Sequence, residues 1–129
     1  MSSTSEAVAL GVQPVAVKGI RITAYRSVPK QTDSSPYITS LGHRVSQQGV
    51  AVSPDLMESG EICYGDVVIL PSSIPAEGMS ARVVNDVTHP RLKRTTDVWV
   101  SSYSMEKRMG IRKQQSVVVV KSPNRFCEK

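Results

Sequence analysis

The sequence predicts a small all-β domain, a closed barrel of six or seven short strands with one short helix. Valine is the commonest apolar residue of this 129-residue chain, whose hydrophobic content is 40%, and valine favours strands. The 8 glycines and 8 prolines divide the apolar residues into short runs. Helical segments do not alternate with these runs, so a barrel is expected rather than a doubly wound sheet.

The expected elements follow from local periodicity. Residues 18–26 alternate apolar and polar side chains, which predicts a half-buried strand. Further strands are expected at residues 50–52, 67–70, 81–84, 97–100 and 116–121. The helix is expected over residues 104–109, with Ser102 or Ser104 as its N-cap, and residues 55–59 can form one helical turn.

The chain divides into an N-terminal arm of residues 1–19, a barrel of residues 20–121 and a tail of residues 122–129. Residues 7–17 are apolar and strand-like, so we expect them to pair with a sheet edge. That edge belongs either to the same barrel or to a neighbouring chain, and we favour the neighbour. Residues 27–48 read as a long loop, which is usually functional or disordered.

The charge and the N-terminus limit the classes of partner. The formal net charge is +5 and aromatic residues make up 5% of the chain. A nucleic-acid partner is not expected, because the densest basic stretch is only Arg91, Lys93 and Arg94, and stacking aromatics are scarce. The apolar N-terminal stretch lacks a basic leader and is broken by Gly11 and Pro14, so neither a signal peptide nor a membrane span is expected.

The cysteines and histidines indicate neither a disulfide scaffold nor a metal site. Cys63 and Cys127 are the only 2 cysteines, and we expect them to be free thiols. His43 and His89 are isolated, without the spacing of metal ligands. We therefore expect no metal and no cofactor.

Several short groups of residues occur in a fixed order between residues 20 and 121. They are Thr23-Ala24-Tyr25, Gln31-Thr32-Asp33, Gly49 to Asp55 (GVAVSPD), Gly65 to Ile69 (GDVVI), Asp86 and Asp97, and Gly110-Ile111-Arg112. This order resembles the 3D (three-aspartate) domain, which is similar to the catalytic barrel of the membrane-bound lytic transglycosylase A family. The resemblance implies a double-psi β-barrel and peptidoglycan glycan strands as the substrate.

The chain departs from the family pattern at three places. Ser53 stands where the family has its first aspartate, although Asp55 follows two residues later. No glycine follows Asp86, and Thr95 stands where an arginine is frequent. Asp86 and Asp97 match the last two aspartates of the family.

The resemblance implies a reaction that needs one carboxylic acid. Asp97 would protonate the oxygen between N-acetylmuramic acid and N-acetylglucosamine, and the C6 hydroxyl of the same sugar would attack C1 to give a 1,6-anhydro product. The acid needs a raised pKa, which Asp86 could provide from a neighbouring strand by like-charge repulsion, with burial adding to it. Without the resemblance, Asp86 reads as a turn cap and Asp97 as a solvated residue at a strand start.

Further residues are candidates for substrate binding: Thr32, Asp33, Asp55, Lys93, Arg94 and Trp99. Thr32 and Asp33 are turn formers first. Lys93 and Arg94 could bind carboxylates of the substrate or could lower the pKa of an aspartate, and the sequence leaves this open. Trp99 lies two residues after Asp97 on one strand and so on its face, although tryptophan is more often a core residue.

Two functions are compatible with these features. The first is a peptidoglycan-cleaving, lytic transglycosylase-like protein carried by a phage, with a virion or tail location favoured over an endolysin and with the host cytoplasm as the place of synthesis. The alternative is a barrel without catalysis that serves as a structural or wall-binding module of a larger assembly. In both, the N-terminal arm would contact neighbouring chains.

Overall fold

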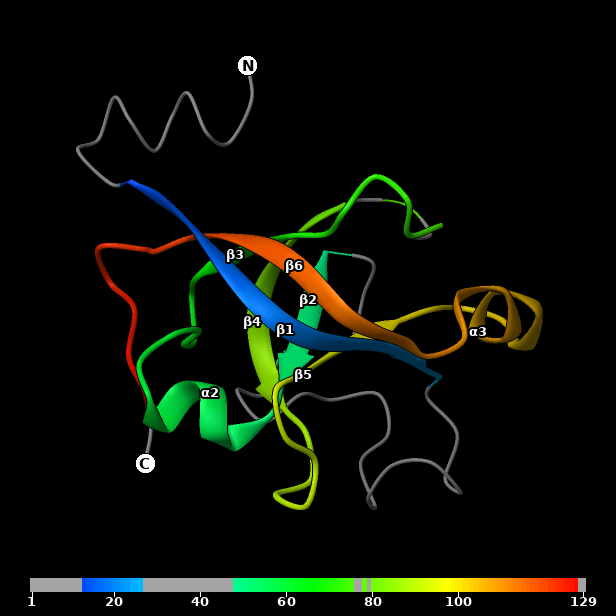
Figure 1. Ribbon diagram of the computed structural model, residues 1–129, viewed down its shortest axis with the longest axis horizontal. Coiled ribbons are helices and arrows are strands. Elements are labelled where there is room, and N and C mark those ends of the chain that lie inside the picture. The colour runs from blue at the N-terminus through cyan, green and yellow to red at the C-terminus, as the bar shows by residue number, and fades with distance from the viewer. Residues whose placement is uncertain (1–12, 27–47, 76–77, 79, 128–129) are drawn as a thin grey trace.

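The computed structural model describes residues 13–26, 48–75, 78 and 80–127 of the chain. Within these residues, six strands form one closed barrel and two short helices lie outside it (Figure 1). The elements are β1 (Pro14–Tyr25), β2 (Gly49–Val52), α2 (Pro54–Glu58), β3 (Val67–Ile69), β4 (Ala81–Val87), β5 (Thr95–Trp99), α3 (Tyr103–Met109) and β6 (Arg112–Val120).

The barrel confirms the predicted all-β fold class. Its strands follow the order β1-β5-β2-β4-β3-β6 around the closed sheet. The pairs β1/β5 and β2/β4 are parallel and the other pairs are antiparallel. A simple up-and-down barrel has no parallel pair, because parallel neighbours need a crossover connection. The mixed order is therefore compatible with the double-psi-like barrel that the resemblance implies.

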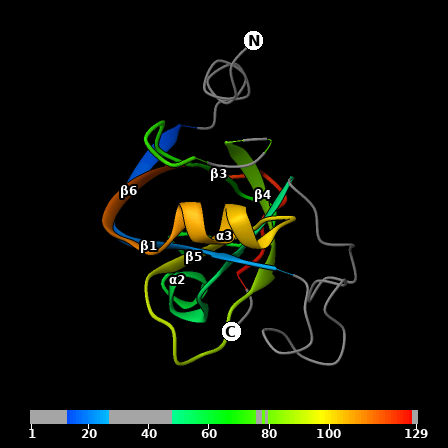
Figure 2. The ribbon, with the colours of Figure 1, turned by 90° about the vertical axis from the view of Figure 1, so that its right-hand side faces the viewer.

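The two helices agree with the local signals in the sequence. Ser102 is the N-cap of α3, and its side chain accepts a hydrogen bond from the Met105 N–H at 3.2 Å. Gly110 ends the helix with a positive φ of 57°. The helical turn expected at residues 55–59 is α2, which begins with Pro54. Figure 2 shows α3 in front of the barrel when the molecule is turned by 90°.

β1 begins earlier than the sequence boundary between arm and barrel. Its first residues, Pro14 to Val17, pair with Val120 to Val117 of β6, and Val17 is buried in the core. Gly19 has a φ of 69°, and the register between the two strands shifts on either side of Ile20. The apparent break in the sequence is therefore a bulge within one strand of 12 residues. Residues 14–19 belong to the barrel, whereas residues 1–12 of the expected arm lie outside the described residues.

The barrel interior is filled by branched aliphatic side chains. The buried core includes Val17, Ile20, Ile22, Val50, Val52, Val68, Val84, Val98, Val117 and Val119. Because side chains alternate along a strand, the residues between these positions point away from the barrel axis. Two inward residues of the described strands are polar. Arg82 of β4 pairs with Val68 and is fully buried, and its Nη1 donates to the Trp99 carbonyl oxygen at 2.9 Å. Thr96 pairs with Ile22 and Val52, and its buried hydroxyl has no hydrogen-bond partner within the part of the chain described.

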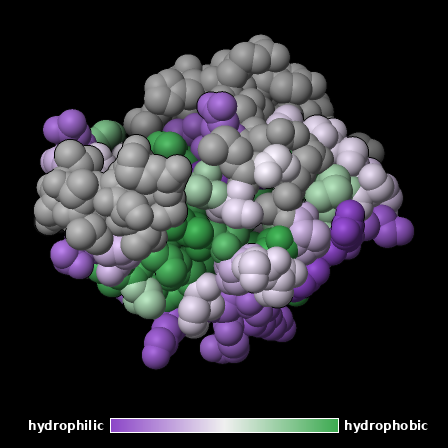
Figure 3. All heavy atoms as spheres, turned by 90° about the horizontal axis from the view of Figure 1, so that it is seen from above, coloured by the Kyte–Doolittle hydropathy of each residue, from purple (hydrophilic) through white to green (hydrophobic). Residues whose placement is uncertain are grey.

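Part of the outer face of β1, β6, β3 and β4 is apolar. Two rows of paired residues run across these four strands: Pro14, Val120, Val67 and Val83, and then Ala16, Val118, Ile69 and Ala81. Val83 is 44% exposed. Figure 3 shows hydrophobic side chains gathered on the side of the molecule seen from above, with hydrophilic ones around them.

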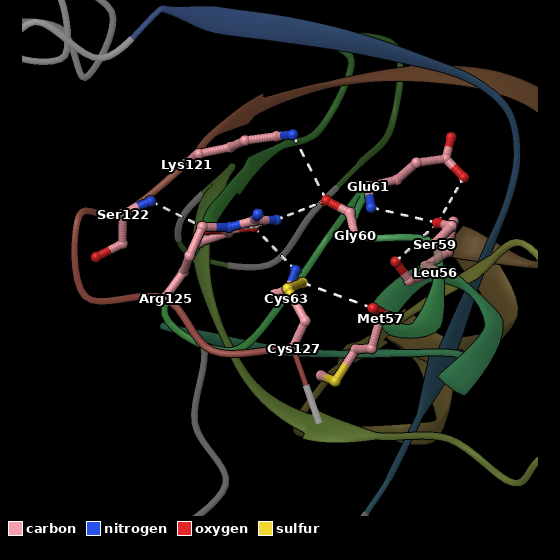
Figure 4. The surroundings of a disulfide bond; sticks show 11 residues. Leu56, Met57, Ser59, Gly60, Glu61, Cys63, Lys121, Ser122, Arg125 and Cys127 are labelled. Atoms are coloured by element: carbon pink, nitrogen blue, oxygen red, sulfur yellow. Dashed lines mark hydrogen bonds and ion pairs between the residues drawn. A yellow bond between two sulfur atoms is a disulfide. The ribbon is translucent and has the colours of Figure 1, made fainter. Parts of the chain in front are cut away.

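The expectation of free thiols is wrong. Cys63 and Cys127 form a disulfide between residues 64 positions apart in the chain (Figure 4). Spacing alone did not indicate it, because the two cysteines meet only after the chain has passed once around the barrel and returned to the loop between α2 and β3. The segment from Lys121 to Cys127, here called the strap, is thereby fixed to that loop.

Candidate functional site

Four residues from four neighbouring strands lie in one row on the outside of the barrel. Asp97 of β5 pairs with Thr23 of β1 on one side and with Ala51 of β2 on the other, and Ala51 in turn pairs with Asp86 of β4. Directly paired residues point to the same face of a sheet. The carboxyl groups of Asp86 and Asp97 therefore share one face, and Ala51 of the intervening strand β2 is paired with both residues. We call these four residues the carboxylate row.

Asp97 is the carboxyl group of the row with the strongest perturbation. Burial raises its pKa, the hydrogen bond from Thr23 lowers it, and the negative charges of Glu106 and Asp86 raise it, so that the pKa is about 6 instead of 3.8. The Thr23 hydroxyl donates this hydrogen bond to Oδ1 at 2.7 Å. A carboxyl group with this pKa is substantially protonated in weakly acidic solution and can donate a proton near neutral pH.

Asp86 does not lie on a strand next to that of Asp97. The sequence suggested neighbouring strands, but β2 lies between β4 and β5. Two strand spacings separate the Asp86 and Asp97 backbones by about 10 Å. Oδ1 of Asp86 accepts a hydrogen bond from the Val87 N–H at 2.9 Å. Burial is the largest cause of the raised pKa of Asp97, and the charge of Asp86 follows that of Glu106.

Two aromatic residues lie beside the row. Tyr25 pairs with Trp99 at the ends of β1 and β5, on the same face as Asp97 and two positions further along each strand. Burial, together with the charges of Asp86 and Asp97, raises the pKa of the Tyr25 phenol, against a smaller lowering by Arg82. Tyr25 therefore stays a hydrogen-bond donor throughout the neutral range. Trp99 is half-buried, and its face agrees with the sequence expectation.

A helix supplies a contributor that the sequence did not reveal. Glu106 of α3 receives a hydrogen bond from Nε of Arg26 at 2.8 Å, and Arg26 follows directly after β1. The local sequence around Glu106 indicates only an acidic residue in the first turn of the helix. No local signal could have linked it to Asp97, because the helix must first fold back towards the end of β1.

The floor beside the row is made of small residues. Gly49 precedes Ala51 by two residues, on the same face of β2. A Cβ atom at Gly49 would lie 2.5 Å from Nδ2 of Asn85, the bulged residue just before Asp86. A side chain at position 49 would therefore force the Asn85 side chain to move. This amide lies next to the carboxylate row and extends the polar surface along β4.

Ser53, where the family has an aspartate, has a structural role. It is fully buried, and its Oγ accepts a hydrogen bond from the Thr95 N–H at 2.9 Å. The Ser53 N–H donates in return to the Thr95 carbonyl oxygen at 2.9 Å. These two bonds join the end of β2 to the start of β5. The position thus holds two strands together and contributes no acid.

Asp55 does not replace the missing aspartate in the row. Its Oδ2 accepts a hydrogen bond from the Arg94 N–H at 2.9 Å, where α2 meets β5. Burial raises the pKa of Asp55, but hydrogen bonds from Ser53 and the Arg94 backbone and the charge of Lys93 outweigh it and hold the pKa below 3.8. Asp55 is therefore ionised at neutral pH and is used to fix the Arg94 backbone.

The basic loop before β5 is also occupied by structural contacts. The Arg94 guanidinium bonds Glu61 through Nη1 at 3.0 Å and the Lys18 carbonyl oxygen through Nη2 at 2.7 Å. Lys93 is exposed, and its backbone carbonyl accepts a hydrogen bond from Thr95 Oγ1. The charges that act on the pKa of Asp97 are Glu106 and Asp86. The Lys93 charge instead lowers the pKa of Asp55.

Other expected site residues give no further information. Thr32 and Asp33 lie outside the described residues, as does His43. His89 is an exposed loop residue whose Nδ1 accepts a hydrogen bond from the Arg91 N–H at 3.1 Å. Within the described ranges, no three histidine, cysteine or acidic residues come together as a metal site. In those ranges there is also no helix with the length and apolar character needed to cross a membrane.

Comparison with known proteins does not assign a family. No protein-family model matches the chain, and no curated protein matches it. The functional argument therefore depends on the carboxylate row itself.

Proposed function

We propose that this protein cleaves peptidoglycan glycan strands as a lytic transglycosylase-like enzyme, with Asp97 as its single acid and base. The observation that carries the proposal is the raised pKa of Asp97, about 6, on the outer face of the barrel next to Thr23. The order of motifs that resembles the 3D domain supports the choice of substrate. The proposal requires only one protonated carboxyl group, and the row provides one.

The proposed reaction uses the protonated carboxyl of Asp97 twice. It first donates its proton to the glycosidic oxygen between N-acetylmuramic acid and N-acetylglucosamine, and the bond from C1 to that oxygen breaks. The carboxylate of Asp97 then accepts the proton of the C6 hydroxyl while the oxygen of that hydroxyl forms a bond to C1. The tethered hydroxyl supplies the advantage of proximity, so no water molecule has to be activated. Asp86 and Glu106 favour the initial protonated state of Asp97 through their charges.

Neighbouring groups suit the binding of a sugar. Trp99 and Tyr25 are aromatic groups on the face of Asp97, and such residues provide apolar surface together with a polar group. Asn85 and the Tyr25 phenol add neutral hydrogen-bonding groups on the two sides of the small residues of β2. We propose Asp97 and Trp99 for the reacting part of the site. We leave Asp55 and Arg94 out of it, because their polar groups are engaged at the junction of α2 and β5.

The test is a digestion of purified cell-wall sacculi, followed by mass spectrometry of the released fragments. We expect 1,6-anhydromuramic ends, which are 18 mass units lighter than hydrolysed ends because no water is added. Asp97→Asn should lower the cleavage rate by about 10²–10⁴-fold, the usual range for loss of an acid–base group. Glu58→Gln, the same change at an exposed position of α2, should cleave at the wild-type rate. Fragments with hydrolysed ends, or an active Asp97→Asn variant, would refute the proposal.

The second candidate is a wall-binding or structural barrel that does not catalyse. Ser53 favours it, because a buried hydroxyl engaged with Thr95 stands at one of the three family aspartate positions. This candidate predicts that the wild type and Asp97→Asn bind insoluble sacculi equally and that neither releases fragments. A co-sedimentation assay run beside the digestion separates the two candidates.

The setting of the proposed activity is a phage particle. A virion or tail location would bring the barrel to the wall, and synthesis would take place in the host cytoplasm. Residues 1–12 could then contact neighbouring chains of the particle. Immunodetection of the protein in purified virions, compared with the cleared host lysate, tests the location and distinguishes a virion protein from an endolysin.

A further inference from the structure

The strap returns from β6 to the loop between α2 and β3 and is fixed there at several points (Figure 4). The Tyr64 N–H donates to the Phe126 carbonyl at 3.1 Å, and the Phe126 N–H donates to the Tyr64 carbonyl at 3.3 Å. The two rings lie with their centroids 4.8 Å apart. The strap thus forms a short antiparallel bridge with the loop, through the pair Tyr64 and Phe126. The strap is not completely buried by this bridge, since Phe126 is 50% exposed.

A buried ion pair lies beneath this bridge. Asp66 has no exposed surface, and its Oδ2 lies 2.9 Å from Nη2 of Arg125. The same carboxylate accepts hydrogen bonds from the backbone N–H groups of Cys63 at 2.8 Å and Ser122 at 3.0 Å. Nη2 of Arg125 also reaches the Gly60 carbonyl oxygen at 2.8 Å. The only cation within hydrogen-bonding distance of Asp66 among the described residues therefore comes from the strap.

The disulfide is the covalent end of this arrangement. It joins Cys63 in the loop to Cys127 at the end of the strap. Cys63 has no exposed surface, whereas Cys127 is half-buried. Without the bond, the strap keeps the ion pair, the Ser122 hydrogen bond to Asp66 and the short bridge, which are all non-covalent. It can then open locally at a lower cost than when the disulfide is closed.

We propose that the Cys63–Cys127 disulfide is a redox lock, which fastens the strap in oxidising surroundings and releases it in reducing ones. The inference is independent of the proposed activity on peptidoglycan, because it concerns the face with α2 and not the carboxylate row. Structural disulfides persist outside the reducing cytoplasm. The freshly made chain would thus carry an open strap, and the strap would be fastened when the protein meets an oxidising environment.

The reaction is thiol–disulfide exchange with an oxidised dithiol protein or a small disulfide. The more accessible Cys127 thiolate attacks one sulfur of the oxidant, and the other sulfur leaves as a thiolate. The Cys63 thiolate then attacks the Cys127 sulfur, and the second thiolate leaves. Two protein thiols lose two protons and two electrons, and one disulfide of the oxidant is reduced to two thiols.

Limited proteolysis with trypsin tests the lock on the full chain, because Lys121 and Arg125 lie within the strap. The protein is equilibrated with oxidised or reduced glutathione, free thiols are trapped by alkylation, and cleavage sites are followed by mass spectrometry. We expect reduction to speed cleavage after Arg125 by about tenfold or more, since cleavage follows the population of the open form. Cleavage after the exposed Lys113 of β6 should not change.

Two controls make the outcome decisive. Cys127→Ser should be cleaved rapidly after Arg125 in both buffers, which shows that the buffers act through the disulfide. The proposal is overturned if oxidised glutathione leaves both thiols free to react. It is also overturned if reduction leaves cleavage after Arg125 unchanged, or speeds cleavage after Lys113 equally, which would make the bond a general staple of the barrel.

Discussion

The carboxylate row and the α2 junction place the same type of side chain in opposite surroundings. We use the name α2 junction for Asp55, Glu61 and Asp66 with their partners Arg94 and Arg125. In the junction, each carboxylate meets a guanidinium or a backbone N–H that the fold directs towards it. In the row, Asp97 is half-buried, and Thr23 is its side-chain donor among the described residues. Burial, together with the negative charges of Glu106 and Asp86, raises its pKa to about 6.

This difference shows how an aspartate becomes chemically useful in a small barrel. A satisfied carboxylate, such as Asp55, stays ionised and serves as a structural acceptor. A buried carboxyl with too few donors keeps its proton to a higher pH and can transfer it. The surroundings of each aspartate therefore decide which of them can act as an acid.

The largest expected effect on stability comes from the junction. Arg125→Ala removes the guanidinium from the fully buried Asp66, and an unpaired buried charge should lower the free energy of unfolding by about 3 kcal/mol. Urea unfolding under oxidising conditions measures this loss. Lys121→Ala is the matched control in the strap, because Lys121 reaches only the Gly60 carbonyl at 3.5 Å and should lose little. Equal losses in the two variants would contradict the role of the ion pair.

The next effect concerns the pH dependence of stability. Because the pKa of Asp97 is raised to about 6, its protonated form favours folding below pH 3.8, and this contribution disappears as the pH rises through 6. As the pH rises from 4 to 7, the free energy of unfolding of Asp97→Asn should therefore increase by about 1–3 kcal/mol relative to that of the wild type. Urea unfolding at several pH values gives the difference.

Asp55→Asn should change the pH dependence of stability in the opposite direction, in the same urea experiment. The pKa of Asp55 is lowered, so its carboxylate stabilises the fold above 3.8 and this contribution is lost as the pH falls. The wild type should therefore exceed Asp55→Asn in stability at neutral pH, and the gap should close in acid. If both variants change with pH in the same direction, the contrast between the row and the junction is wrong.

A smaller effect tests the hydrogen bond that Thr23 donates to Asp97. The hydrogen bond from Thr23 lowers the pKa of Asp97, so Thr23→Val should raise it. If Asp97 is the acid, the fall in kcat/KM that begins above about pH 6 should move upward by about one pH unit, since hydrogen bonds to charged groups contribute about 1.5–3 kcal/mol. A pH–rate profile on sacculi measures the shift. A purely structural role would lower the rate at every pH and leave the shape of the profile unchanged.

The smallest effect contrasts two adjacent threonines of β5. Thr96 directs a buried hydroxyl into the barrel without a hydrogen-bond partner among the described residues. Thr96→Val should therefore be neutral or stabilising by up to about 1 kcal/mol. Thr95→Val removes the bond to the Lys93 carbonyl at 2.8 Å and should destabilise. Thermal unfolding of the two variants makes the comparison, and a clear loss for Thr96→Val would reveal a partner for this hydroxyl.

Much of the fold could be predicted because strand formation here depends on local patterns. Short apolar runs at residues 81–84 and 97–100 became β4 and β5, and the helix signals around Ser102 were sufficient for α3. The start of β1 was assigned to the arm because the apolar run of residues 7–17 and the alternating residues 18–26 differ in pattern. A bulge looks like a strand end in sequence, and only the pairing with β6 shows that the strand continues.

The site was predicted less completely, because its properties depend on residues distant in the chain. Asp97 and Trp99 share a face for local reasons, and this was expected. The contribution of Glu106 and the structural roles of Ser53 and Arg94 arise from contacts across the barrel. The disulfide was missed for the same reason, since its cysteines are 64 residues apart.

The pairing of β1 with β6 has a consequence for the synthesis of the protein. Among the described strands, the first to leave the ribosome closes the barrel against the last, with Pro14 opposite Val120. The sheet cannot close before β6 has emerged, so closure of the barrel is late and depends on contacts between distant residues. Because Pro14 pairs with Val120, the first and last residues of the barrel segment also lie close together. A circular permutant that links these ends and opens the chain between α3 and β6 should keep the architecture while changing the order in which its strands are made.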